Sequence, residues 1–273
     1  MRHVAEGQYL PHGIPPTVPN VARMYDYYLG GKDNFAVDRE AADKIISIVP
    51  SVRSTTKANR AFLGKAVSLL ARAGVRQFVD IGAGLPTQDN VHQVVQRVAA
   101  DARTVYVDND PVVLVHARAL LEDNPETKVI GGDLRRPKEL LADPDLREHI
   151  DFGRPVAVLM LAVLHFIPDH DEVDAIVETV RRALVPGSYL LLSHFYTPDD
   201  EQDTVRAGAK AYSSTNAGSL TARSLTRING YLSGLDLIEP GLVPVRTWRP
   251  AWEEEAVVDL SVPDLLGAVG RVP

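Results

Sequence analysis

Aspartates and glycines stand where short apolar segments of this sequence end. Asp80, Gly82 and Gly84 close the first such segment, Asp108 closes the second, and Asp133 follows the third. An aspartate after the second segment is placed to accept hydrogen bonds from both hydroxyls of a ribose. An aspartate after the third can accept from the exocyclic amine of an adenine. The joint pattern therefore predicts an adenosine site, although each acid alone is also typical of a helix cap.

The spacing of the glycines narrows the choice of adenosine cofactor. A dinucleotide-binding loop has the pattern Gly-x-Gly-x-x-Gly, and its third glycine seats a pyrophosphate at a helix N-terminus. Here Gly82 and Gly84 are followed by Pro86 and Thr87, and no lysine of a phosphate-binding loop comes after them. The pattern favours a cofactor without a diphosphate over NAD. S-adenosylmethionine (SAM) is such a cofactor, because it carries an amino acid group in place of the phosphates.

The elements that must position these groups alternate between strands and helices from residue 77 onward. Such alternation predicts a doubly wound parallel sheet, in which ligands bind beyond the carboxyl ends of the strands. Ala162, Val163 and His165 would follow the fourth strand, and His194 the fifth. The expected strands are 77–81, 104–107, 128–130, 156–161, 189–193, 242–247 and 266–272, and the expected helices between them include 90–99, 111–121 and 171–184.

The remaining segments do not follow this alternation of strands and helices. Residues 1–20 contain four prolines, which predict an extended or disordered tail. In residues 21–75 the apolar residues have the spacing of helices, but the segment is too short to form a hydrophobic core of its own. We therefore expect a helical cap or lid on the domain 76–273. Residues 197–233 interrupt the strand–helix alternation and predict a polar helical insert. We find no internal repeat.

The composition excludes several kinds of chemistry. The 273 residues contain no cysteine, which excludes disulfides, thiolate metal sites, cysteine nucleophiles and cysteine-ligated iron–sulfur clusters. The net charge of −7 disfavours nucleic-acid binding, which needs a basic surface. The longest apolar run, 156–164, is far shorter than the roughly 20 residues of a membrane span, and the first 20 residues lack the apolar region of a signal peptide. We therefore expect a cytoplasmic protein with no metal site and no nucleic-acid or membrane partner.

Several runs of residues resemble class I SAM-dependent methyltransferases. These runs are 78–87, 105–111, 132–134, 161–167 and 184–190. More narrowly, the sequence resembles an actinobacterial family of S-adenosyl methyltransferases formerly labelled a domain of unknown function, through residues 20–34, 59–60, 84–87, 239–243 and 248–250. The resemblance implies a seven-stranded Rossmann-like sheet whose last strand, 266–272, is antiparallel. It implies little about the methyl acceptor.

The resemblance also implies roles for individual residues. Asp80 would act on the methionine ammonium of SAM, and Arg60 could grip its carboxylate, although a surface role for Arg60 is equally open. Leu134 and Ala162 would contact the adenine, and residues of the segment 21–34 would close over the cofactor. The cofactor-binding candidates are Tyr25, Asp26, Gly30, Asn34, Arg60, Asp80, Gly82, Ala83, Gly84, Asp108, Asn109, Asp133, Leu134, Ala162 and Val163.

Methyl transfer from a sulfonium needs little from the protein beyond proximity, alignment and exclusion of water, because the leaving group is already activated. His165 is a candidate general base for a hydroxyl or amine acceptor, and a structural histidine is its alternative. We expect a small-molecule acceptor between the lid and the insert 197–233, and S-adenosylhomocysteine (SAH) as the second product. The expected aromatic walls of that cavity are Tyr25, Tyr28, Tyr196 and Tyr212.

Two other functions stay open on the sequence. A SAM-binding or SAM-sensing module would keep the adenosine site and lack an acceptor pocket. A nucleotide-dependent oxidoreductase is less favoured because of Thr87 and because Asp133 suits an adenine. The run Asp108-Asn109-Asp110-Pro111 resembles a signature of amino-methylating enzymes that act on nucleic acids, but it follows the second strand instead of the fourth.

Overall fold

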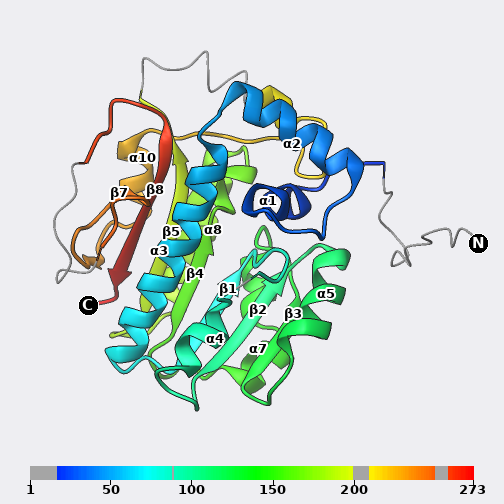
Figure 1. Ribbon diagram of the computed structural model, residues 1–273. Coiled ribbons are helices and arrows are strands. Elements are labelled where there is room, and N and C mark those ends of the chain that lie inside the picture. The colour runs from blue at the N-terminus through cyan, green and yellow to red at the C-terminus, as the bar shows by residue number, and fades with distance from the viewer. Residues whose placement is uncertain (1–16, 88, 199–208, 250–257) are drawn as a thin grey trace, which may run out of the picture.

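The computed structural model describes residues 17–87, 89–198, 209–249 and 258–273, and a mixed sheet lies at its centre (Figure 1). Most of the expected N-terminal tail, and part of the expected insert, fall outside these residues. Five strands pair in parallel in the order β3-β2-β1-β4-β5. They are β1 (Gln77–Ile81), β2 (Arg103–Asp108), β3 (Thr127–Gly131), β4 (Ala157–Leu161) and β5 (Tyr189–Tyr196).

The far edge of the sheet is antiparallel. Strand β8 (Asp264–Arg271) runs antiparallel to β5 along its whole length, from Tyr189 opposite Arg271 to Tyr196 opposite Asp264. On its other side β8 pairs with two short strands, β6 (Asp236–Leu237) and β7 (Val243–Pro244). The doubly wound sheet with an antiparallel last strand is thus confirmed.

The edge strand that pairs with β8 differs from the expected strand 242–247. It is divided between β6 and β7, so the sheet has eight strands. The expected strand 242–247 was too long, and β6 was missed. Pro240 and Gly241 separate the two pieces, and Pro244 has no N–H with which to continue the pairing.

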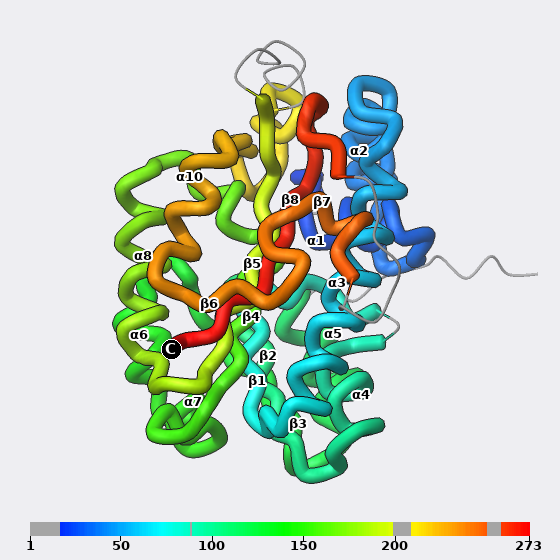
Figure 2. The backbone as a smooth tube through the Cα atoms, turned by 90° about the vertical axis from the view of Figure 1, so that its left-hand side faces the viewer, coloured from blue at the N-terminus to red at the C-terminus, as the bar shows by residue number. Residues whose placement is uncertain are grey.

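Helices cover both faces of the sheet (Figure 2). On one face lie α3 (Val52–Arg72), α4 (Val91–Gln96) and α5 (Pro111–Leu121), and on the other lie α6 (Pro137–Leu141), α7 (Pro144–His149), α8 (His170–Arg182) and α10 (Leu225–Gly230). Successive residues of a strand point toward the helices on opposite faces of the sheet. Phe78 packs against α3 and α4, while Val79 packs against the helices on the other face. Helix α4 ends at Gln96, three residues before the expected end.

The N-terminal helices α1 (Val21–Leu29) and α2 (Ala36–Ile48) lie over the carboxyl ends of the parallel strands (Figure 1). The Asn20 side chain caps α1 by accepting hydrogen bonds from the next N–H groups. A buried ion pair, Arg23 Nε to Asp38 Oδ2 at 2.6 Å, joins α1 to α2. Met24, Tyr28 and Ile45 form a small core with Tyr212, so the two helices share their packing with the segment after β5.

Among the described residues, no helix combines the length and the apolar character that crossing a membrane would require.

Candidate cofactor and acceptor site

A cavity of about 550 Å³ opens at the carboxyl ends of β1, β2, β3 and β4. Its roof comes from α1 and α2, one side from the start of α3, and another from residues 209–220. The volume lies within the range of about 300–1,000 Å³ typical of small-molecule sites. Of the residues proposed from the sequence, the cavity is lined by Tyr25, Asp26, Arg60, Asp80, Gly82, Ala83, Gly84, Asp108, Asn109, Asp133, Leu134, Ala162, Val163 and His165.

Gly30 and Asn34 do not line this cavity. Gly30 has a φ of +86° and ends α1, a left-handed position that glycine adopts without strain. Asn34 Nδ2 donates to Asp26 Oδ2 at 2.8 Å. Both residues therefore shape the turn after α1, and Asn34 reaches the cavity only through Asp26.

Asp108, at the end of β2, is held by two backbone donors. Its Oδ2 accepts from the N–H of Gly84 at 2.9 Å, and its Oδ1 accepts from the N–H of Asp110 at 2.9 Å. Burial raises the pKa of Asp108, and these hydrogen bonds oppose the shift. Each carboxylate oxygen keeps a second lone pair, so the fixed carboxylate can still accept two hydroxyl donors.

Asp80 is 5% exposed at the end of β1. Burial raises the pKa of its carboxyl to about 7; the charge of Arg60 lowers that pKa, and Asp108 raises it. Arg60 also donates from Nη2 to the backbone carbonyl of Asp89 at 3.1 Å. A carboxyl group whose pKa lies near neutral pH, beside the Arg60 cation, suits a ligand with an ammonium for Asp80 and a carboxylate for Arg60.

Asp133 is already engaged by a neighbour. Arg135 forks onto it, with Nη2 to Oδ2 at 2.7 Å and Nε to Oδ1 at 3.0 Å. This hydrogen-bonded pair lowers the pKa of Asp133, so the carboxylate stays ionised. An adenine amine would share the carboxylate with Arg135. This ion pair was not predicted from the sequence.

The glycine turn after β1 is tightly packed at one point and open at the next. Gly82 has a φ of +77°, and a Cβ there would lie 2.6 Å from Cγ2 of Val163. Gly84 has a φ of +67°, and a Cβ there would meet no atom within 4 Å. The first glycine is needed for packing, whereas the second leaves backbone open for a ligand to approach.

A chain of hydrogen bonds links α1 to the end of β4. Asn59 Nδ2 donates to the Tyr25 hydroxyl at 3.0 Å, and Ser193 Oγ donates to Asn59 Oδ1 at 2.8 Å. The N–H of Ala162 donates to Ser193 Oγ at 2.9 Å. Ala162 has a φ of +53°, an uncommon conformation for a residue with a side chain. The chain therefore fixes a strained turn that lines the cavity.

His165 lies in the short helix η1 (Leu164–Phe166), directly after β4. It is 5% exposed, and its Nδ1 has no hydrogen-bond partner in the described part of the chain. Burial and the nearby charge of Arg223 lower the pKa of His165 to about 3. A neutral imidazole with so low a pKa can accept a hydrogen bond but is a weak base at neutral pH.

Arg223 holds the loop that carries His165. Its guanidinium is 2% exposed and donates to the carbonyls of Leu164 and Ile167 and to Nε2 of His194. His194, which was expected after the fifth strand, lies within β5. Its ring is occupied by Arg223 and by the carbonyl of Phe195, at 2.8 Å each.

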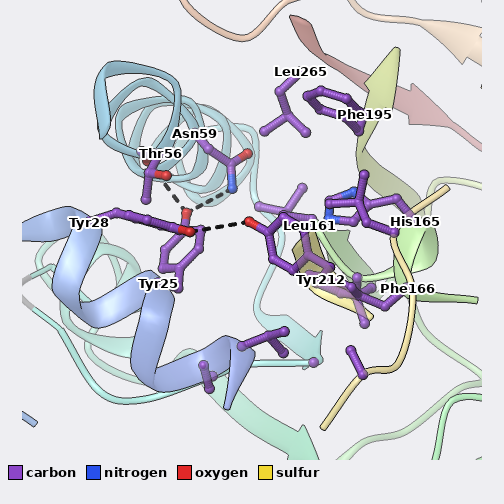
Figure 3. A pocket seen from close by; sticks show the side chains of 18 of the residues that line it. Tyr25, Tyr28, Thr56, Asn59, Leu161, His165, Phe166, Phe195, Tyr212 and Leu265 are labelled. Atoms are coloured by element: carbon purple, nitrogen blue, oxygen red, sulfur yellow. Dashed lines mark hydrogen bonds between the residues drawn. The ribbon is translucent and has the colours of Figure 1, made fainter. Parts of the chain in front are cut away.

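Aromatic side chains from separate elements face one another across the cavity (Figure 3). Tyr25 and Tyr28 come from α1, and Tyr212 approaches from the opposite side, its hydroxyl 3.4 Å from that of Tyr28. Tyr196 does not line the cavity, so its prediction as an aromatic wall residue is wrong. The Tyr196 hydroxyl donates instead to the carbonyl of Leu260 at 2.9 Å.

Asn20 fastens the N-terminal helices to the sheet domain. Its Nδ2 donates to Asp110 Oδ2, and Asp110 caps α5 through its other oxygen. Asn216 accepts from the N–H of Val21 at 2.9 Å and donates to the same Asp110 oxygen at 3.5 Å. The start of α1 is therefore anchored beside the residues that follow Asp108.

The sheet and its strand-end acids and glycines fit a SAM-dependent methyltransferase of Rossmann-like fold, and the comparison with known families shows that class. The model of a family described as S-adenosyl methyltransferase matches residues 8–273, and the chain belongs to that family. No curated protein matches the chain.

Two solved structures are each 38% identical to this chain. A DUF574 family protein from Streptomyces avermitilis has a TM-score of 0.84, and the match covers 94% of this chain and 98% of that one. A Thermobifida fusca protein, provisionally named a methyltransferase, has a TM-score of 0.86 with 97% and 99% covered. NodS, an N-methyltransferase from Bradyrhizobium japonicum solved with SAH, is 13% identical with a TM-score of 0.50 over 93% and 99%, a likeness of fold alone.

Proposed function

We propose that this enzyme moves the methyl group of SAM to an oxygen or nitrogen of a small molecule. The observation that carries the proposal is the continuity of the cavity: the strand-end acids and the aromatic side chains of α1, η1 and residues 209–220 line the same space. A roofed cavity of about 550 Å³ suits two small ligands side by side and limits the amount of water around them.

The strand-end residues suit the separate parts of SAM. Asp108 offers lone pairs to two ribose hydroxyls, and Asp80 with Arg60 offers an anion and a cation to the amino acid group. The open space in front of Gly84 allows close approach to the backbone. Asp133 and Leu134 would meet the adenine. Bound there, SAM supplies an activated methyl group.

The chain's own residues would align the acceptor and keep water out. The acceptor's lone pair forms the new bond to the methyl carbon, the carbon–sulfur bond breaks with its electrons on sulfur, and the acceptor's proton passes to solvent. The Asn59–Ser193 chain would hold Tyr25 and the Ala162 turn in place during this step. Proximity of this kind supplies a large part of such a rate enhancement.

Transfer of a labelled methyl group tests the proposal. The protein is incubated with methyl-labelled SAM and a cell extract separated into small molecules, proteins and nucleic acids. Label in the small-molecule fraction is expected, and label confined to macromolecules would contradict the proposal. If SAM binds but no fraction is labelled, a SAM-sensing module becomes the better account. Asp108→Ala protein serves as the negative control.

We expect the affinity for SAM to depend on pH through Asp80. Only the ionised carboxylate attracts the ammonium of SAM, so affinity should rise from pH 6 to pH 8, by up to about tenfold per pH unit below the pKa of about 7. Stability without ligand should move the other way. The folded-state pKa lies above the unfolded value of 3.8, so the contribution of Asp80 to stability falls as the pH rises through about 7.

Calorimetry of wild type and Asp80→Asn across this pH range checks the expectation. The variant cannot ionise at this position and should lose most of the pH dependence. An equal slope in both proteins would show that Asp80 does not meet the ammonium.

A further inference from the structure

The part of the cavity away from the strand-end acids is lined mainly by apolar and aromatic side chains, together with Asp264. Its walls combine aliphatic side chains of α2, β4 and β8 with aromatic side chains of α1, η1, β5 and the segment 209–220. The residues concerned are Tyr28, Ile45, Ile48, Leu161, Phe166, Phe195, Tyr212 and Leu265. Because the two ends of the cavity differ so clearly in polarity, we call this apolar end the acceptor half.

Asp264 and the buried Arg223 lie beside the acceptor half, and the guanidinium of Arg223 already donates to backbone carbonyls and histidine rings. Asp264 is 3% exposed and pairs with Arg246 Nη1 at 2.9 Å. The cationic side chains that line the cavity within the described residues are Arg60, close to Asp80, and Arg135, paired with Asp133, both at the other end. An anionic acceptor would lose its hydration without any described cationic side chain in the adjoining wall of the cavity to contact it, because Arg223 is not among the lining residues. A protonated amine would lack the lone pair that must attack the methyl carbon.

The rings of the acceptor half meet edge to face. His165 and Phe166 have centroids 4.5 Å apart at 64°, and His165 and Phe195 have centroids 6.5 Å apart at 74°. Phe166 is tilted by 58° from Tyr212 at 5.9 Å. Steeply inclined rings present both faces and edges to the cavity, and aromatic ligands pack favourably against either.

His165 is a polar group of this surface whose ring lacks a hydrogen bond within the described part of the chain; Oδ2 of Asp264 also lacks one but is ion-paired with Arg246. The His165 ring lines the cavity, and none of the hydrogen bonds among the described residues ends on that ring. Nδ1 is buried without a partner, and Nε2, which is not buried in this way, is the ring nitrogen that a ligand in the cavity can meet. An acceptor that brings a hydrogen-bond donor would find its complement here.

We propose that the methyl acceptor is an uncharged molecule with a flat aromatic ring and an O–H or N–H group that donates to the imidazole of His165. This inference rests on the proposed function and adds the class of substrate. The hydrogen bond orients the acceptor, its oxygen or nitrogen forms the bond to the methyl carbon, sulfur keeps the electrons of the broken bond, and the displaced proton goes to water. His165 orients the acceptor and does not retain the proton.

Four probes on protein saturated with SAH test the class of acceptor. Calorimetry compares 2-naphthol with naphthalene, which lacks the donor, with 2-naphthoate, which is charged, and with decahydro-2-naphthol, which is not flat. We expect 2-naphthol to bind at least tenfold more tightly than any of the other three. Tighter binding of 2-naphthoate, or equal binding of all four, would overturn the proposal.

Two variants connect that preference to His165. His165→Phe keeps a ring of similar size and should lower the affinity for 2-naphthol about tenfold while leaving naphthalene unchanged. Tyr196→Phe removes a buried hydroxyl that does not line the cavity and should change 2-naphthol binding less than threefold. Equal losses in both variants would contradict a hydrogen bond to His165.

The measurements separate this inference from the proposed function. If SAH binds and the probes do not follow the expected order, the class of acceptor is wrong and methyl transfer stands. If SAH itself does not bind, the proposed function fails first. The ranking of probes on the wild type decides the matter even if His165→Phe does not fold.

Discussion

Replacing Asp108 by alanine is expected to weaken the binding of SAM and SAH by about 3 kcal/mol, roughly a hundredfold. Two hydrogen bonds to a buried carboxylate would be lost, and bonds to charged groups are the stronger ones. The N–H groups of Gly84 and Asp110 would also lose their acceptor, so the glycine turn would be less well held. Calorimetry with SAH measures the effect directly.

Asp108→Asn is the matched control for this loss. It keeps one carbonyl oxygen and a similar volume but removes the charge, so its affinity should fall between those of wild type and Asp108→Ala. Both variants should stay folded, because Asp108 lies at the end of β2 and outside the apolar core. Burial raises the pKa of Asp108, so removing its charge also removes an unfavourable desolvation energy. Unchanged affinity in a folded Asp108→Ala protein would mean that the ribose does not lie at the end of β2.

Replacing Gly82 by alanine is expected to lower the free energy of unfolding by about 3 kcal/mol. Its φ of +77° strains any residue with a side chain by about 1–2 kcal/mol. The new Cβ would also lie 2.6 Å from Val163, and overpacking of this kind adds about 1–3 kcal/mol. Val163 is β-branched and has few ways to move aside.

Gly84→Ala separates the two contributions. Gly84 has a similar φ of +67° but no atom within 4 Å of a new Cβ, so only the backbone strain applies. Chemical denaturation should show a loss of about 1 kcal/mol there, while the affinity for SAH falls because the methyl group enters the open space. Equal destabilisation of the two variants would contradict the tight contact between Gly82 and Val163.

The strands of the sheet could be predicted because their residues carry local signals. Residues 157–161 are apolar throughout and buried on both faces, as expected of a central parallel strand. Pro111 behind Asp110 indicated the start of α5. The short strands β6 and β7 carried no such signal, because each consists of only two residues and is defined by its pairing with β8.

The acids of the cofactor end could likewise be proposed from the sequence, since each directly follows a strand. The contacts that hold them could not. Asn59 and Ser193 are 134 residues apart, and neither stands in a recognisable motif with the other. The same holds for Asn20 and Asp110, 90 residues apart. Polar contacts between distant segments depend on the finished packing, which the spacing of residues along the chain does not encode.

The protonation state of His165 could not be predicted from the sequence either. The position of this residue after β4 was apparent from the sequence, and that position suggested a general base. Its environment decides otherwise, because burial beside Arg223 lowers the pKa to about 3. Arg223 lies 58 residues further along the chain, and nothing in its local sequence marks it as buried.

Titration of the wild-type protein with SAM, SAH and NAD in one calorimetric series shows whether the cavity binds a methyl donor. We expect SAM and SAH to bind and NAD to bind at least a hundredfold more weakly, because the turn after β1 lacks the third glycine that seats a pyrophosphate. Binding of NAD more tightly than SAM would contradict the assignment of the cavity to a methyl donor.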